Sequence, residues 1–225
     1  MNKKYFEIVK TKILKQLNSE EYIKAYEGTE QGTVDKKHSM EVVDLVKQVW
    51  KKYESTDIPE ALLIGALVHD SDRYYPKREV NTKNCPKSHY GYRKGIHSGN
   101  TALIFFEENS KDLPIELTRD ICFLILRHER GGDVDKEMNL FDKKDEFTNS
   151  YNLNKAANYL YYADKMSFFS SNIYEYKKRG LEKLKEKILF SIEDLPEEIR
   201  EEIFSFDFKD KEISTIMKQV ETQKK

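Results

Sequence analysis

Apolar residues recur at helical spacing along almost the whole chain, and this pattern predicts helices rather than strands. No stretch sustains the alternation of Val, Ile and Thr that is typical of a half-buried strand. We expect helices near residues 3–27, 34–54, 58–70, 91–109, 114–130, 152–179, 181–193, 197–205 and 209–222, the sixth of them bent. The sequence therefore predicts an all-α fold.

Three of these helices are preceded by an Asp that a Pro follows two residues later, at 57–59, 112–114 and 194–196. An Asp can cap the free backbone N–H groups of a helix start, and Pro in the first turn costs no hydrogen bond. Loops are expected at 71–90, which is mostly basic, and at 131–151, which is largely acidic and polar. Both exceed the usual length of a connection, and long loops in compact domains are often functional.

A chain of 225 residues is long enough for one domain with an appendage. We predict a main helical domain over residues 1–180 and an amphipathic helical appendage over 181–225 that packs on it. The near balance of 39 basic and 40 acidic residues, with 12% aromatics, argues against disorder. A net charge of -1 also argues against a general nucleic-acid binder.

The cysteine and hydropathy patterns predict a cytoplasmic protein. The two cysteines, Cys85 and Cys122, form no CxxC spacing, which fits a reducing compartment. No apolar segment resembling a signal peptide follows the basic N-terminus, and no apolar run is long enough to span a membrane. We therefore expect no membrane partner, and nothing in the pattern indicates an oligomeric state.

Three histidines and one aspartate lie at the ends of apolar helical stripes. His38 is followed by apolar residues at i+4, i+7 and i+11, whereas His69, His128 and Asp164 are preceded by apolar or small residues at i−7, i−4 and i−3. These spacings place each side chain on an inward helix face. A buried carboxylate is costly unless it is paired or bound to a metal. Imidazoles and carboxylates that converge from several helices suit first-row divalent metals.

The dyad His69-Asp70 follows the apolar run 61–68. Adjacent residues on a helix point about 100° apart, but at the end of a helix both can reach one ion that lies between helices. Gly65, one turn before His69, is expected to let a neighbouring helix approach closely.

In this order, His38, His69-Asp70 and Asp164 within Tyr162-Ala163-Asp164-Lys165 resemble the HD superfamily of metal-dependent phosphohydrolases. The resemblance covers roughly residues 30–175 and implies an HD-type helical bundle with an N-terminal helix. His97 and His128 resemble the two additional histidines of the dinuclear subgroup of that superfamily.

The resemblance implies a ligand set for one or two divalent ions, among Fe, Mn, Co, Mg, Ni and Zn. His38, His69 and Asp164 would complete one metal, His97 and His128 would hold the second, and Asp70 would bridge them. His97 leaves an alternative open, because its small and polar neighbours could equally line a substrate pocket. In that case His97 would contact phosphate or act as an acid or base.

The implied activity is hydrolysis of a phosphoester or phosphoanhydride bond in a nucleotide or similar small phosphorylated compound. Metal-bound water would provide the hydroxide that attacks phosphorus. The candidate catalytic residues are Asp70, Asp72, Arg130 and Lys165, and the candidate phosphate contacts are Arg73, Arg93, Lys94, Arg130 and Lys165. Asp72 could act behind a ligand, as an acid or base, or only in a turn. Each basic residue could also be a solvated surface charge.

Two other functions remain open from the sequence. The six-residue ligand set also resembles that of the di-iron oxygenases of the same superfamily. A third possibility is a module that senses a nucleotide or phosphate without turnover. Metal content and products separate these possibilities. The chain has no P-loop, no Gly-rich dinucleotide fingerprint, no G-x-S-x-G elbow and no H-E-x-x-H motif.

Overall fold

The computed structural model describes residues 3–27, 31–78, 90–129 and 152–224, without the side chains of 31–34, 90–94 and 224. Over these ranges the regular structure is helical and contains no strand, which confirms the predicted all-α class. The chain divides into two compact units, Met1–Ala163 and Asp164–Lys225. Of the described helices, none combines the length and the apolar character that crossing a membrane requires.

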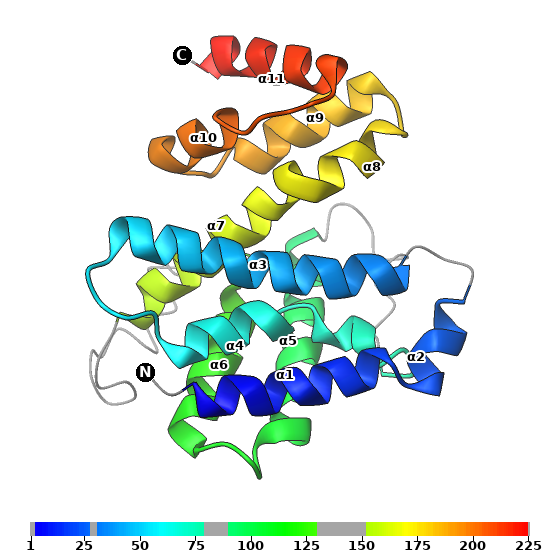
Figure 1. Cartoon of the computed structure of the whole chain (residues 1–225), viewed down its shortest axis with the longest axis vertical. Helices are drawn as coiled ribbons and strands as arrows, with labels where there is room; N and C mark the ends of the chain where they lie inside the picture. The colour runs from blue at the N-terminus through cyan, green and yellow to red at the C-terminus, as the bar shows by residue number, and fades with distance from the viewer. Residues whose placement is uncertain (1–2, 28–30, 79–89, 130–151, 225) are drawn as a thin grey trace. The chain divides into compact units, whose positions relative to one another are not determined.

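The first unit holds the helices from the N-terminus to the greater part of α7 (Figure 1). They are α1 (Lys4–Leu17), α2 (Glu20–Ala25), α3 (Gln31–Tyr53), α4 (Glu60–Val68), the 3-10 helix η1 (Ser71–Tyr74), α5 (Tyr90–Asn109), α6 (Ile115–Arg127) and α7 (Leu153–Ser167). Helix α7 continues past Ala163 into the second unit.

Helix α4 forms the centre of the first unit. Every residue from Ala61 to Val68 is buried, because α4 packs against α1, α3 and α6 and is apolar on all sides. A Cβ atom on Gly65 would lie 3.2 Å from Cβ of Leu124 in α6. The glycine therefore permits the close helix approach that the sequence predicts. This approach brings the ends of α4 and α6, where two of the candidate ligands lie, into the same unit interior.

The helix starts differ from the prediction in one detail. Pro59, Pro114 and Pro196 are themselves the residues that precede the first turns of α4, α6 and α10 (Glu197–Phe204), with φ of -58°, -54° and -56°. Each Asp then lies two residues further out, which is too far for the usual capping bond. Asp112 instead binds Lys12, with Nζ 2.5 Å from Oδ2.

Two other segments also differ from the sequence prediction. The helix expected over 3–27 is broken between α1 and α2, because Ser19 starts a new helix and its Oγ accepts a hydrogen bond from the backbone N–H of Tyr22 at 3.2 Å. The loop expected over 71–90 begins with η1, a single 3-10 turn that is too short to produce a hydrophobic period.

The second unit begins with the end of α7 and a π-helical turn, η4 (Phe168–Asn172), that interrupts the predicted helix 152–179. It continues through α8 (Ile173–Lys177), α9 (Leu181–Ile192), α10 and α11 (Lys211–Lys224). Gly180, with φ of 103°, joins α8 to α9 in a conformation that other residues rarely adopt. Helix α9 packs against α8 and α11 and buries its apolar stripe, Leu184, Ile188 and Ile192.

Candidate metal centre

Two helices present a histidine in the same way. His69 caps the C-terminus of α4 and His128 caps that of α6, with nearly identical φ and ψ of -56° and -28° against -57° and -29°. Nδ1 of each ring lies 2.8 Å and 2.6 Å from a backbone carbonyl three residues earlier. A carbonyl only accepts, so Nδ1 donates and carries the hydrogen. Each Nε2 therefore keeps a lone pair that can bind a metal.

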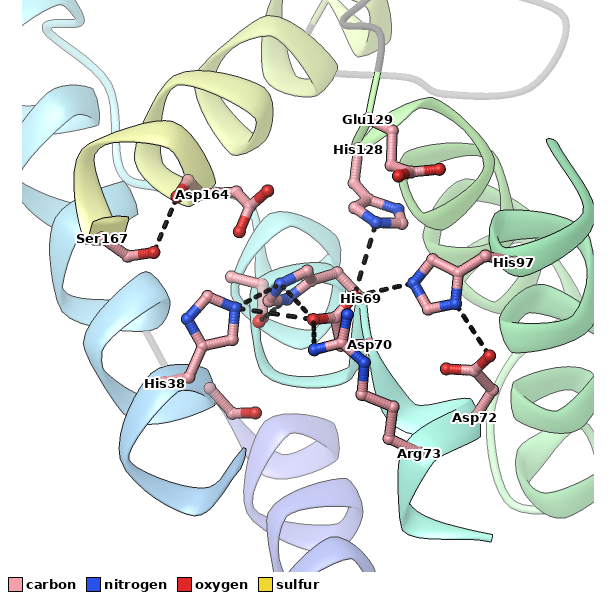
Figure 2. Close-up of polar contacts among 12 residues, drawn as sticks. His38, His69, Asp70, Asp72, Arg73, His97, His128, Glu129, Asp164 and Ser167 are labelled. Atoms are coloured by element: carbon pink, nitrogen blue, oxygen red, sulfur yellow. Dashed lines mark hydrogen bonds and ion pairs between the residues drawn. The ribbon is translucent and has the colours of Figure 1, made fainter. Parts of the chain in front are cut away.

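The first group of possible ligands consists of His38, His69 and Asp164, whose ligand atoms all lie within 4.8 Å of one another. Helix α3 supplies His38, and its Nε2 lies 3.1 Å from Nε2 of His69. Helix α7 supplies Asp164, whose carboxylate points toward the two histidines in Figure 2. The backbone carbonyl of Asp164 accepts a hydrogen bond of 2.7 Å from Oγ of Ser167, one turn further along the chain.

The second group consists of Asp70, His97 and His128, again with ligand atoms within 4.8 Å of one another. Helix α5 supplies His97, and its Nε2 lies 2.8 Å from Oδ1 of Asp70. Asp70 lies between His69, the C-cap of α4, and the first residue of η1, so the turn between these helices fixes its position. The structure thus brings all six of the predicted ligand residues into two adjoining groups (Figure 2).

The carboxylate of Asp70 faces both groups. Its Oδ2 lies 3.6 Å from Nε2 of His38 and 3.7 Å from Nε2 of His69. Its Oδ1 lies 2.8 Å from Nε2 of His97 and 3.6 Å from Nε2 of His128. Imidazole nitrogens and carboxylate oxygens are the donors that first-row divalent ions accept. The donor set therefore fits a metal, and the position of Asp70 fits a bridging ligand.

Electrostatics keep Asp70 ionised. Burial alone would raise the pKa of this carboxyl group, but Arg73 and His69, with hydrogen bonds from His38 and His97, hold it well below its usual range. Nη1 of Arg73 lies 2.6 Å from Oδ2 of Asp70. Asp70 in turn raises the pKa of Arg73, so the guanidinium stays charged. Asp70 is thus available as an anionic ligand near neutral pH.

His97 lies between two carboxylates. Its Nδ1 is 2.8 Å from Oδ2 of Asp72, and Asp72 is only 1% exposed. Burial alone would lower the pKa of His97, but the hydrogen bonds to Asp70 and Asp72 raise it to about 10. The second carboxylate oxygen of Asp72 is buried without a hydrogen-bond partner in the described part of the chain. Asp72 therefore contacts the second group of possible ligands through the ring of His97.

The structure describes the side chains of two predicted phosphate contacts, Arg73 and Lys165. Arg73 touches Asp70, and Nζ of Lys165 lies 5.1 Å from the ring centre of Phe190. Arg93 and Lys94 are in α5, but their side chains fall outside the description. Arg130 lies outside the described residues altogether. Arg73 therefore directly contacts one of the candidate ligands, Asp70.

Two acidic residues near the site were missed from the sequence. Glu129 directly follows His128 (Figure 2). Its carboxylate accepts a hydrogen bond of 3.2 Å from Oγ of Ser98, which follows His97 in α5. Asp35, one turn before His38, accepts a hydrogen bond of 2.6 Å from the hydroxyl of Tyr22 and is buried. Adjacency to His128 was the available signal for Glu129, and helical spacing from His38 was the signal for Asp35.

Comparisons of the chain with protein-family models, with curated proteins and with solved structures found no significant match. The arrangement of the described side chains therefore carries the functional argument.

Proposed function

We propose that this protein is a metal-dependent phosphohydrolase of the HD type that cleaves a phosphoester or phosphoanhydride bond in a small phosphorylated compound. The observation that carries the proposal is the division of the Asp70 carboxylate between two groups of donors. One oxygen faces His38 and His69, and the other faces His97 and His128. A shared carboxylate between two sets of three donors is suited to a two-metal site that clamps a phosphoryl group.

In this proposal His38, His69 and Asp164 hold one ion, His97 and His128 hold the other, and Asp70 binds both. Divalent ions held there would supply an ionised water near neutral pH and would neutralise charge on the phosphoryl oxygens. Burial of His69, Asp70 and His128 supports this chemistry, because charges act more strongly on one another where bulk water is excluded.

Arg73 is the residue that we assign to the phosphate group. Its guanidinium is planar and permanently charged, which suits the oxygens of a phosphate. The side chain is 38% exposed while Nη1 touches Asp70, so it can contact a substrate without losing its anchor. Arg73 would thus orient the phosphoryl group against the ligands. Arg93, Lys94, Arg130 and Lys165 remain predicted phosphate contacts.

Metal analysis of protein purified without chelators tests the proposal most directly. A panel of nucleotides and phosphoesters is then assayed with Mn, Co or Mg restored to chelator-treated protein. We expect phosphate release that depends on the added metal. Bound iron together with oxygen consumption would favour the oxygenase instead. Stoichiometric nucleotide binding without any product would favour a sensing module.

The variant Asp70→Ala removes the ligand common to both groups. We expect it to abolish turnover and metal binding while the helical circular dichroism signal is kept. Asp120→Ala is the matched control, because Asp120 is also a buried carboxylate of the first unit but lies in neither ligand group. Normal activity of Asp70→Ala would refute the mechanism.

A further inference from the structure

Three side chains of the first unit connect α2 and α3 to Arg73, and we call them the anchor residues: Tyr22, Tyr26 and Asp35. The hydroxyl of Tyr26, the C-cap of α2, donates a hydrogen bond of 3.2 Å to the backbone carbonyl of Arg73. The hydroxyl of Tyr22 donates one of 2.6 Å to Oδ2 of Asp35 in α3. The two tyrosine rings are in contact, with 4.9 Å between their centres. The anchor residues thus form a continuous path of contacts from α3 through α2 to Arg73.

The turn that carries Arg73 is also held by its last residue. The hydroxyl of Tyr74 shares a hydrogen bond with Oγ of Ser39 in α3. The backbone carbonyl of Tyr74 accepts a hydrogen bond of 2.7 Å from Nε2 of Gln16 in α1. Side chains from three helices therefore hold η1 through contacts that involve no candidate ligand. The backbone of Arg73 is fixed in this way, and the direction of its long side chain is what remains to be set.

Asp35 is a buried carboxylate that lies in neither ligand group. It also acts on the guanidinium, because Asp70 and, to a smaller extent, Asp35 raise the pKa of Arg73 against the effect of burial. Burial and the hydrogen bond to Asp35 raise the pKa of Tyr22, so this phenol keeps its hydrogen and continues to donate it. A buried carboxylate is costly unless it is paired. Asp35 therefore has a phenol that orients it and a guanidinium that compensates its charge.

Asp70 alone would be a weak anchor for Arg73 in the proposed site. Nη1 of Arg73 lies 2.6 Å from Oδ2 of Asp70, the oxygen that also faces His38 and His69 (Figure 2). Metal binding at this oxygen would place a second positive charge close to the guanidinium, and like charges repel. A carboxylate outside the ligand groups provides an attraction that metal binding does not remove. Asp35 meets this requirement.

We propose that Asp35, Tyr22 and Tyr26 are positioning residues, which keep the guanidinium of Arg73 directed at the phosphate group while the two ligand groups hold their ions. This inference rests on the proposed function, in which Arg73 contacts the phosphoryl group. Tyr26 fixes the backbone of Arg73, Asp35 attracts its guanidinium, and Tyr22 orients the carboxylate of Asp35. The three residues act through Arg73 and not on the substrate itself.

Isothermal titration calorimetry with inorganic phosphate tests the proposal on protein reloaded with Mn²⁺, without relying on turnover. Asp35→Asn removes the charge but keeps an oxygen that can accept the hydrogen bond from Tyr22. Tyr26→Phe removes only the hydroxyl that binds the carbonyl of Arg73. We expect each variant to weaken phosphate binding by about fivefold or more, which corresponds to ~1 kcal/mol for residues that act in one network.

A double-mutant cycle with Arg73→Gln separates positioning from a general structural role. Both substitutions should lose their effect on phosphate affinity, to within about twofold, once the guanidinium is absent. A structural role would persist in that background.

The matched controls come from the same unit. Tyr159→Phe removes a hydroxyl that donates a hydrogen bond of 2.5 Å to a carboxylate, that of Glu54, and Asp120→Asn removes another buried carboxylate. Both should bind phosphate as the wild type does.

Two results would overturn the inference: an unchanged phosphate affinity in either Asp35→Asn or Tyr26→Phe, or an equal loss of affinity with and without Arg73. A reloaded wild-type protein that binds no phosphate would overturn it together with the role of Arg73. A failure of the proposed function alone would instead appear as absent metal-dependent hydrolysis, while phosphate binding still depends on Arg73 and the anchor residues.

Discussion

Three histidines of the site differ in the hydrogen-bond partner of Nδ1. For His69 and His128 the partner is a backbone carbonyl, whereas for His97 it is the carboxylate of Asp72. A carboxylate behind a ligating imidazole orients the ring and makes it a stronger donor. The second group of donors should therefore depend on Asp72, which itself lies in neither ligand group.

The variant Asp72→Asn tests this dependence. The amide keeps the shape of the side chain but not its charge, so we expect affinity for the ion held by the second group to fall about 10–100-fold. Titration of chelator-treated protein with Co²⁺ should show weaker binding of the ion at the second group of donors and unchanged binding at the first group. Asp120→Asn is the control for the loss of a buried carboxylate. Equal weakening at both groups would point to a general loss of structure.

The raised pKa of His97 predicts a pH dependence of stability in chelator-treated protein. The pKa rises from 6.5 to about 10 on folding, so the folded state holds the proton more tightly. The resulting stabilisation is complete below pH 6.5 and is lost as the pH rises toward 10. The urea midpoint should therefore fall between pH 7 and 10. His97→Asn should flatten that part of the profile, and an unchanged slope in this variant would contradict the assignment.

Individual residues differed in how readily the sequence revealed them. His69, His128 and Asp164 were found because each closes an apolar stripe. The interaction of Asp72 with His97 was less accessible, because it joins η1 to α5 across segments that sequence periodicity does not relate. Glu129 and Asp35 were not predicted for the same reason. Their hydrogen-bond partners, Ser98 and Tyr22, lie on other helices, so the contacts depend on how the helices pack.

At the level of the elements, the contact between α4 and α6 determines how close two of the candidate ligands, His69 and His128, come to each other. Both helices end in a candidate ligand, and Gly65 sets their separation through its contact with Leu124. The sequence predicted this approach because a glycine interrupts an otherwise bulky apolar run. The sequence did not predict the break at Ser19. The apolar spacing alone would continue the helix there, but the side chain of this one serine caps a new helix.

The variant Gly65→Val should push α4 and α6 apart. Cβ of Leu124 is attached to the backbone and cannot move away easily, so we expect a loss of about 1–3 kcal/mol in the free energy of unfolding. Urea denaturation measures this loss. Gly95→Ala is the control in α5, where an added Cβ meets no described atom within 4 Å. That variant should gain about 0.5–1 kcal/mol from helix propensity. Equal effects of the two variants would refute the packing argument.

At the scale of the whole molecule, the candidate ligands come from positions between His38 and Asp164 in the sequence. An ion that needs all of them binds only the folded chain, so its binding free energy adds to the stability of the fold. The overall helical class followed from local periodicity. The grouping of the six donors was implied by the family resemblance instead, because local periodicity does not specify the long-range packing that assembles them.

Metal removal should therefore lower the melting temperature. An ion at 100 times its dissociation constant contributes about 2.7 kcal/mol, which for a chain of this size corresponds to a shift of about 5–11 °C. Calorimetry with and without chelator measures the shift. Asp70→Ala should abolish it. A melting temperature that chelation leaves unchanged in the wild type, after bound metal has been shown to be removed, would contradict the proposed site.

The C-terminal arrangement that α4 and α6 share could also be introduced at the end of a helix in another protein. It consists of a histidine immediately after the last helical residue and a backbone carbonyl three residues earlier that accepts a hydrogen bond from Nδ1 of the ring. All of its parts lie within four consecutive residues, so it can be moved to another helix without its neighbours. Two helices that end side by side would then each present one Nε2 lone pair, oriented by local torsion angles before any ion binds.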